Sequence, residues 1–218
     1  MNENSTSREK ILSRLRAAQA NIQPVEAVQD HLPMVPAIDP APAALLELFV
    51  EQARLLTSEV YLPAGPDEAI RQILDLLGDD PKVMGWAFTH LPLPGLAEVL
   101  VEKGIQVSVE RDAGVRVGLT GADAALAATG SLILQTGPGK PRIASLLPLV
   151  HIAVIQQSQI LPDLEAWVAV QRRQGVDAFQ AISSAMIISG PSRTADIAKQ
   201  LILGMHGPRE LHIFVLAE

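Results

Sequence analysis

The chain contains no cysteine in its 218 residues. This absence excludes disulfides, thiol nucleophiles, cysteine-ligated zinc and iron–sulfur clusters. The five histidines also lack the His-x-x-x-His and His-Glu-x-x-His spacings of zinc sites, so we expect no bound metal. The Gly-x-Gly-x-x-Gly signature of dinucleotide binding follows none of the expected strands. We therefore expect no cofactor.

Long apolar runs and an excess of positive charge are missing as well. No uninterrupted apolar segment reaches the roughly 18 residues of a membrane span. The first residues lack the basic and apolar regions of a leader peptide. The formal net charge of −7 argues against a general nucleic-acid-binding surface. We expect a cytoplasmic protein that binds neither membranes nor nucleic acid.

Aromatic residues are scarce, at 3% of the chain, whereas hydrophobic residues make up 48%. A chain of this length buries roughly 70% of its unfolded surface, which is enough for a full core. That core must consist mainly of Leu, Ile, Val and Ala. An aliphatic interior of this kind favours an α/β protein.

The sequence divides near residue 40. Ser7 is a suitable N-cap for a basic amphipathic helix over 8–20, which either packs as a solvated helix or binds a partner. Five prolines from Pro24 to Pro42 indicate an extended linker. We predict an N-terminal helix and proline-rich linker over 1–39 and one compact α/β domain over 40–218.

Helix and strand patterns alternate through the second part. This alternation is typical of βαβ units, in which a mostly parallel sheet is covered by helices on both faces. We therefore expect a three-layer α/β/α fold. The expected helices cover 42–56, 67–77, 94–103, 162–173 and 194–205, and the expected strands cover 59–62, 82–86, 105–109, 131–134, 151–155, 185–188 and 211–216.

The segment after the strand at 185–188 is the first candidate for a binding site. The start of a helix there would present free backbone N–H groups and a partial positive charge to an anion. A cation in the first turn opposes the helix dipole, so Arg193 should have a carboxylate or a bound anion beside it. The predicted ligand-binding residues are Gly190, Ser192, Arg193 and Thr194, and the apolar face that predicts the helix is Ala198, Leu201, Ile202 and Met205.

A second cluster of small residues covers 118–131. It forms either a tight helical turn with Asp123 as its cap, or a pocket in which Asp123, Thr129 and Ser131 form hydrogen bonds to a ligand. Asp123 is the only charged residue between Arg116 and Lys140. We include Thr129 among the ligand-binding candidates.

The segment 136–142 superficially resembles a phosphate-binding loop. The pattern fails because Leu134 stands where a glycine is required and Pro141 where Ser or Thr would bind magnesium. We predict a surface hairpin turn. Lys140 and Arg142 could still reach an anionic ligand from it.

Two histidines have competing interpretations. His151 begins an apolar strand, so we expect a hydrogen-bonded histidine in the core or at its rim, with a catalytic base as the alternative. His206, at the end of the expected helix, either interacts with the helix dipole or donates a proton beside Ser192. No catalytic residue is established, and the candidates are Asp123, Asp196 and His206.

At 189–197 and 204–208 the chain resembles the lactate utilization protein C family, the single-domain branch of the LUD domain group. The stretches 120–130 and 145–152 support the resemblance in the same order along the chain. The resemblance extends over about 40–218.

This resemblance implies a fold like that of ribose-phosphate isomerases and CoA transferases. It also implies a part in oxidising L-lactate to pyruvate beside iron–sulfur partner proteins, with a lactate- or pyruvate-like anion as ligand. Where Ala128 stands, members of the wider group often carry an acidic residue, so attention moves to Asp123 and Asp196. The alternatives are a stand-alone enzyme acting on a phosphorylated sugar or acyl-CoA, and a non-catalytic assembly module that uses the helix at 8–20.

Overall fold

The computed structural model describes residues 7–20, 38–108, 110–175, 182–195 and 201–217. By its internal contacts the chain forms two units, Met1–Pro36 and Ala37–Glu218. The first unit contains helix α1 (Ser7–Gln19), which has no buried residue. The helix expected over 8–20 is therefore confirmed.

A six-stranded sheet forms the centre of the second unit. Its strands lie in the order β1-β12-β7-β4-β2-β3, and every neighbouring pair is parallel. The mostly parallel α/β fold expected from the sequence is confirmed. The strands are β1 (Glu59–Tyr61), β2 (Lys82–Gly85), β3 (Gln106–Ser108), β4 (Val117–Gly121), β7 (Val150–Gln156) and β12 (Glu210–Leu216).

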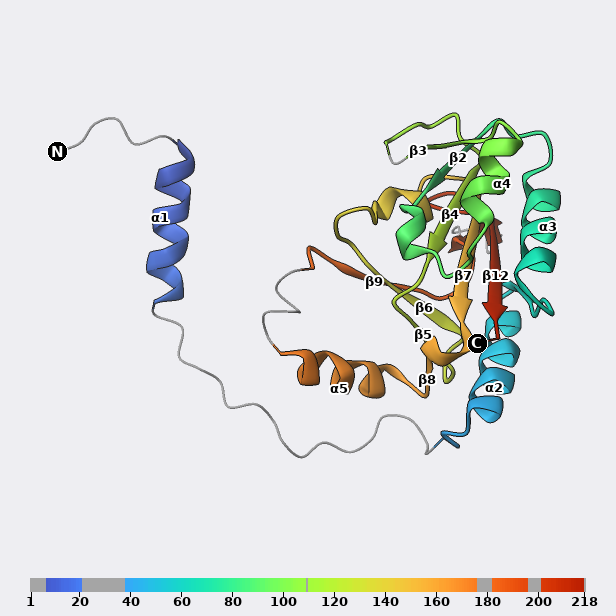
Figure 1. Ribbon diagram of the computed structural model, residues 1–218. Helices are drawn as coiled ribbons and strands as arrows, with labels where there is room; N and C mark the ends of the chain where they lie inside the picture. Colours follow the sequence, from blue (N-terminus) through green and yellow to red (C-terminus); the bar gives the residue numbers. More distant parts are fainter. Residues whose placement is uncertain (1–6, 21–37, 109, 176–181, 196–200, 218) are drawn as a thin grey trace. The chain divides into compact units, whose positions relative to one another are not determined.

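Helices α3 (Pro66–Leu77) and α4 (Leu96–Glu102) cover one face of this sheet (Figure 1). Pro66 suits the first position of α3 because its fixed φ matches the helix and its missing N–H is not needed there. The buried face of the helix packs on strand residues of the same apolar cluster. The helical members of that cluster are Ala69, Ile70, Ile73, Leu77, Leu96 and Leu100, and the central strands contribute Val83, Val117, Leu119, Ile152, Val154 and Phe214.

The opposite face is covered by helix α2 (Pro42–Leu55) and by a second sheet. This smaller sheet has the order β8-β5-β6-β9, with β6 antiparallel to both neighbours. Helix α5 (Leu164–Gln174) covers its outer side through Trp167. The strands are β5 (Ala124–Leu126), β6 (Ser131–Gln135), β8 (Ile160–Leu161) and β9 (Ala185–Ile188).

The small-residue stretch 118–131 does not form the helical turn that we expected. It forms most of β4 and all of β5, and Asp123 lies between two strands rather than at a helix cap. Every residue of β4 and β5 is buried between layers, so packing overrides the helix preference of alanine. A Cβ on Gly118 would lie 1.8 Å from the carbonyl oxygen of Ala144, in the 3₁₀ helix η2 (Arg142–Ser145).

The helix expected over 194–205 is also wrong. Strands β10 (Arg193–Ala195) and β11 (Leu201–Leu203) form an antiparallel pair there, and Asp196 lies outside the described residues. Backbone bonds continue the pairing, because Gly204 N donates to Ser192 O at 2.9 Å. A contiguous run of three aliphatic residues suits a strand as well as a helix face.

Two consequences follow for residues near the end of β11. Met205 is 57% exposed instead of lying on a buried helix face. His206 is exposed in a bend, so it does not stand at a helix C-terminus. The basis for its predicted interaction with a helix dipole is therefore absent.

Candidate functional site at the carboxyl edge of the sheet

The chain reverses its direction across the parallel sheet between β2 and β4. From β2 it passes through α4 to β3 at one edge, whereas from β4 it passes through the second sheet to β7 on the other side. In open α/β sheets, ligands bind beyond the carboxyl ends of the strands at such a switch point. The residues directly after β2 and β4 therefore define the candidate site.

Three segments meet at this point. Trp86 follows β2, and its backbone N–H donates to Leu119 O in β4 at 3.0 Å. Asp123 follows β4 by two residues. The turn at 137–140 approaches from β6, since Ala87 N donates to Gly139 O at 2.8 Å and Lys140 N to Gly137 O at 3.0 Å. The hairpin turn expected at 136–142 is confirmed.

Lys140 and Asp123 form an ion pair at the centre of the site. Lys140 Nζ also lies 5.0 Å from the ring centroid of the buried Trp86, which is within reach of a cation–π interaction. Asp123 Oδ2 accepts a hydrogen bond from Gln135 N at 2.7 Å. The side chains of Lys140 and Asp123 are 20% and 17% exposed, so the pair is largely buried yet reachable from solvent.

The segment around His90 packs closely against this cluster. A Cβ on Gly121 would lie 2.6 Å from His90 O, and a Cβ on Gly139, whose φ is +72°, would lie 3.1 Å from His90 Nε2. His90 Nε2 is 3.1 Å from Pro138 O. Glycine is required at Gly121 because the backbone of His90 approaches so closely, and it is favoured at Gly139 because of the positive φ. His90 is therefore a neighbour of the Lys140–Asp123 pair, although its sequence context indicated no role.

Arg193 has a partner, but it is neither a carboxylate nor an anion. Its Nη2 donates to Leu56 O at 2.6 Å and to Thr57 Oγ1 at 2.5 Å. These atoms lie at the C-terminal end of α2, where the helix dipole is negative and a cation is favourable. Gly190, with φ +86°, packs on the same helix end, since a Cβ there would lie 2.6 Å from Leu56 O.

A chain of hydroxyl groups lies beside the same helix. Thr129 Oγ1 donates to Ser131 Oγ at 2.8 Å, and Ser131 Oγ is 2.7 Å from Ser189 Oγ. Gly130 lies between them with φ +62°, and a Cβ there would lie 2.2 Å from Ala53 N in α2. The structure thus places Thr129, Gly190 and Arg193 around the end of α2.

Of the other predicted ligand residues, Ser192 is half-buried and forms backbone hydrogen bonds to both Pro208 and Gly204. Thr194 pairs with Ile202 in the β10–β11 hairpin. A ligand-binding role for these residues and for the α2 end remains a prediction. The helix N-terminus on which we based it is not present.

His151 lies in the core, as one of the two interpretations expected. Its Nε2 is 2.8 Å from Thr120 Oγ1, and both side chains are buried. Burial, together with the nearby His212, lowers the pKa of His151 to about 3. The imidazole is therefore neutral at physiological pH.

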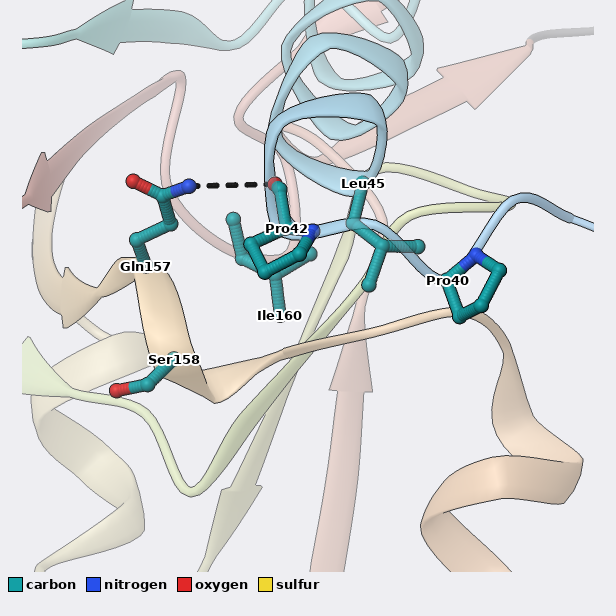
Figure 2. Close-up of a pocket in the computed structure, with 6 residues that line it drawn as sticks. All are labelled: Pro40, Pro42, Leu45, Gln157, Ser158 and Ile160. Carbon is teal, nitrogen blue, oxygen red and sulfur yellow. Dashed lines mark hydrogen bonds between the residues drawn. The ribbon is translucent and has the colours of Figure 1, made fainter.

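A cavity of about 470 Å³ lies at the other end of α2 (Figure 2). Gln157 Nε2 donates to Pro42 O at 3.2 Å across it. None of the lining side chains carries a charge that would bind an anion. They are Pro40, Pro42, Leu45, Gln157, Ser158 and Ile160.

Across the described part of the chain, no group of three or more His, Cys, Asp or Glu residues could hold a metal ion. No helix in that part is long and apolar enough to cross a membrane.

Sequence reasoning identified Asp123 and Lys140 separately and missed both their contact and Trp86. A signal was present: Asp123 is the only charge in a long apolar stretch that ends at Lys140. Isolated charges in a buried region need a partner of opposite sign. Trp86 gave no signal, because nothing in its flanking sequence shows that a turn 50 residues later packs on it.

Comparison with known proteins agrees with the α/β architecture and defines the family. A crystal structure of a DUF162 family protein from Deinococcus radiodurans matches with a TM-score of 0.58 and 26% identity, over 82% of this chain and 99% of that one. The LUD domain matches residues 46–216. The chain therefore belongs to the LUD domain family.

Several relatives share a name. Lactate utilization protein C of Exiguobacterium is 28% identical over 93% of both chains. Lactate utilization protein C of Halalkalibacterium halodurans is 37% identical over 51% of this chain and 45% of that one. An uncharacterized protein of Neisseria meningitidis is 27% identical over 97% of this chain and 94% of its own length.

Proposed function

We propose that this chain is a cytoplasmic component of a system that oxidises L-lactate to pyruvate. The relatives named lactate utilization protein C support this role, one of them over nearly its whole length. The sequence has no cysteine with which to hold an iron–sulfur cluster, so we assign electron transfer to iron–sulfur partner proteins. This chain, without a redox cofactor of its own, binds the small carboxylate.

The largely buried ammonium group of Lys140 is the observation that carries the binding role. It lies at the switch point of the parallel sheet, where α/β proteins bind ligands. An ammonium group has three N–H donors, so contact with Asp123 leaves donors for a ligand carboxylate. Asp123 already balances the charge of Lys140, which favours a singly charged carboxylate over a phosphate ester with two negative charges.

The role is tested by deleting the gene and growing the strain on L-lactate or on pyruvate as the only carbon source. We expect growth on L-lactate to be lost and growth on pyruvate to be kept, because only the first requires lactate oxidation. A plasmid copy of the gene should restore growth. Normal L-lactate consumption by the deletion strain would contradict the proposed role.

The site is tested in the same strain with two plasmid-borne variants. Lys140→Gln should fail to restore growth on L-lactate. Lys82→Gln is a matched control, since Lys82 forms an ion pair with Asp112 at 2.7 Å and lies at the opposite end of β2. It should restore growth fully. If Lys140→Gln restores growth as well as the wild type does, the site lies elsewhere.

A further inference from the structure

The Lys140–Asp123 pair places a hydrogen-bond donor directly beside an acceptor, and both side chains are partly exposed. We propose that this pair recognises a 2-hydroxy carboxylate, with Lys140 binding the carboxylate and Asp123 accepting a hydrogen bond from the 2-hydroxyl group. The inference rests on the carboxylate site proposed above. It adds a residue that determines specificity and a substrate class.

The chemistry of the two groups matches that of a 2-hydroxy acid. The carboxylate and the hydroxyl of such an acid stand on adjacent carbon atoms, so one side of the molecule presents an acceptor next to a donor. A 2-oxo acid presents acceptors only. Its keto oxygen would face the Asp123 carboxylate without a proton between them. A site built to bind a hydroxyl group discriminates strongly against a ligand that lacks it, because the polar group of the site is then left unpaired.

Asp123 is held in place for this contact. Its Oδ2 accepts from Gln135 N at 2.7 Å, and its own N–H donates to Ile133 O at 2.8 Å. Trp86 lies beneath Lys140 Nζ. An ionised carboxylate has about four lone-pair sites, so the contacts with Gln135 and Lys140 leave sites for a hydroxyl proton. The side chain needs no rearrangement before it binds.

Selectivity for the hydroxy acid has a consequence for turnover in the proposed system. The substrate is the 2-hydroxy acid, and its oxidation removes two protons and two electrons, from the C2–H and O–H bonds, with the electrons passing to the iron–sulfur partner proteins. The product therefore lacks the hydroxyl hydrogen that bonds to Asp123. The 2-oxo acid formed would then be bound more weakly at the same site. Release of the product therefore follows from the loss of one hydrogen bond to a charged group.

The test is titration of the purified full-length chain, followed by NMR or calorimetry, with L-lactate, pyruvate, propionate and 2-methoxypropionate. Propionate lacks the hydroxyl group, and 2-methoxypropionate has a methyl group in place of the hydroxyl proton. We expect L-lactate to bind about tenfold more tightly than each of the other three, as one hydrogen bond to a charged group implies. These ligands test the Asp123 contact without changing the protein.

Variants then assign the two roles. Asp123→Asn removes the charge while keeping the shape, and should reduce the preference for L-lactate over pyruvate to less than about threefold. Lys140→Gln should lower the affinity for each of the four acids about tenfold or more. Lys82→Gln should leave every affinity unchanged. A thermal melt shows whether each variant is folded.

The outcomes separate this inference from the proposed function. The inference would be overturned if the wild type bound L-lactate and pyruvate equally well, or bound neither. It would also be overturned if folded Asp123→Asn kept the wild-type preference for L-lactate. Loss of growth on L-lactate in the deletion strain together with any of these results leaves the lactate role standing. If the deletion strain grew normally on L-lactate while the purified chain bound L-lactate selectively, the proposed role in lactate oxidation would be overturned. The binding site for a 2-hydroxy carboxylate would still stand.

Discussion

His151 Nε2 lies 2.8 Å from Thr120 Oγ1, and this hydrogen bond joins the neighbouring parallel strands β7 and β4 inside the core. The second ring nitrogen, Nδ1, is buried and has no hydrogen-bond partner among the described residues. A second imidazole, His212, lies near enough to disfavour a positive charge on the first. The core therefore tolerates only the neutral form of His151.

Stability should consequently fall in mild acid. The pKa of His151 is about 3 in the folded chain, against about 6.5 for an unfolded histidine. Between these values the unfolded state binds a proton that the folded state does not, so the free energy of unfolding falls as the pH decreases through this window. The maximum contribution of this one group is about 1.4 kcal/mol per pH unit. Above pH 6.5 it contributes no pH dependence.

His151→Gln isolates this contribution, because glutamine can bond to Thr120 and does not titrate. Urea unfolding of both proteins from pH 7.5 to pH 4 measures the two slopes. We expect the free energy of unfolding of the variant to fall less steeply with decreasing pH below about pH 6.5. Parallel pH profiles would show that His151 does not remain neutral in the folded chain.

Close packing at Gly118 should make this position intolerant of any side chain. A Cβ there would lie 1.8 Å from Ala144 O, a backbone atom that cannot move without displacing η2. We expect Gly118→Ala to lower the free energy of unfolding by about 3 kcal/mol, as overpacking of a core does. Gly137→Ala is the control, because nothing lies within 4 Å of the added Cβ. Equal midpoints of urea unfolding for the two variants would contradict this packing.

Arg193 should contribute to stability through α2. Arg193→Ala removes a cation and two hydrogen bonds from the helix end, and we expect a loss of about 1 kcal/mol because the side chain is exposed. The affinity for L-lactate should not change. Arg71→Ala, on the exposed side of α3, serves as the control and should leave both quantities unchanged. Lost binding with unchanged stability would instead support the ligand role first predicted for Arg193.

The Lys140–Asp123 pair should show strong energetic coupling. Lys140→Met alone leaves a largely buried carboxylate without its partner, and we expect a loss of about 3 kcal/mol. Adding Asp123→Asn should recover part of this loss. The same double-mutant cycle on Lys82 and Asp112, whose side chains are more than a third exposed, should show much weaker coupling. Additive effects at Lys140 and Asp123 would contradict their contact.

Most of the parallel sheet could be predicted from the sequence, because β2, β7 and β12 are largely apolar runs, but β4 lies in the small-residue stretch for which we expected a helical turn. In β7 all residues except His151 and Gln156 are aliphatic, and β12 is apolar except for Glu210 and His212. The second sheet could be predicted only in part. β5 consists of Ala124, Ala125 and Leu126, a composition that favours a helix in isolation, and only packing between α5 and the central sheet makes it a strand.

The candidate site could be predicted only as separate residues. Asp123 and Lys140 were recognisable as isolated charges, but the contact between them depends on the β6 turn and on Trp86. Arg193 was expected to have a carboxylate or an anion beside it, and the structure instead places the carbonyl oxygen of Leu56 and the hydroxyl of Thr57 there, at the end of α2 and more than 130 residues earlier. A helix end exists only after tertiary folding, so no local pattern near Arg193 could indicate it.

The strand order of the central sheet determines which strands remain unpaired while the chain is being synthesised. β1 pairs in that sheet with β12 alone, and Val60 lies opposite Ile213. A nascent chain on the ribosome therefore exposes one side of β7 and all of β1 until β12 has been translated. Contacts this distant in sequence make folding slow and leave unpaired strand edges open to aggregation. We expect chaperones that hold nascent chains to raise the yield of this protein markedly.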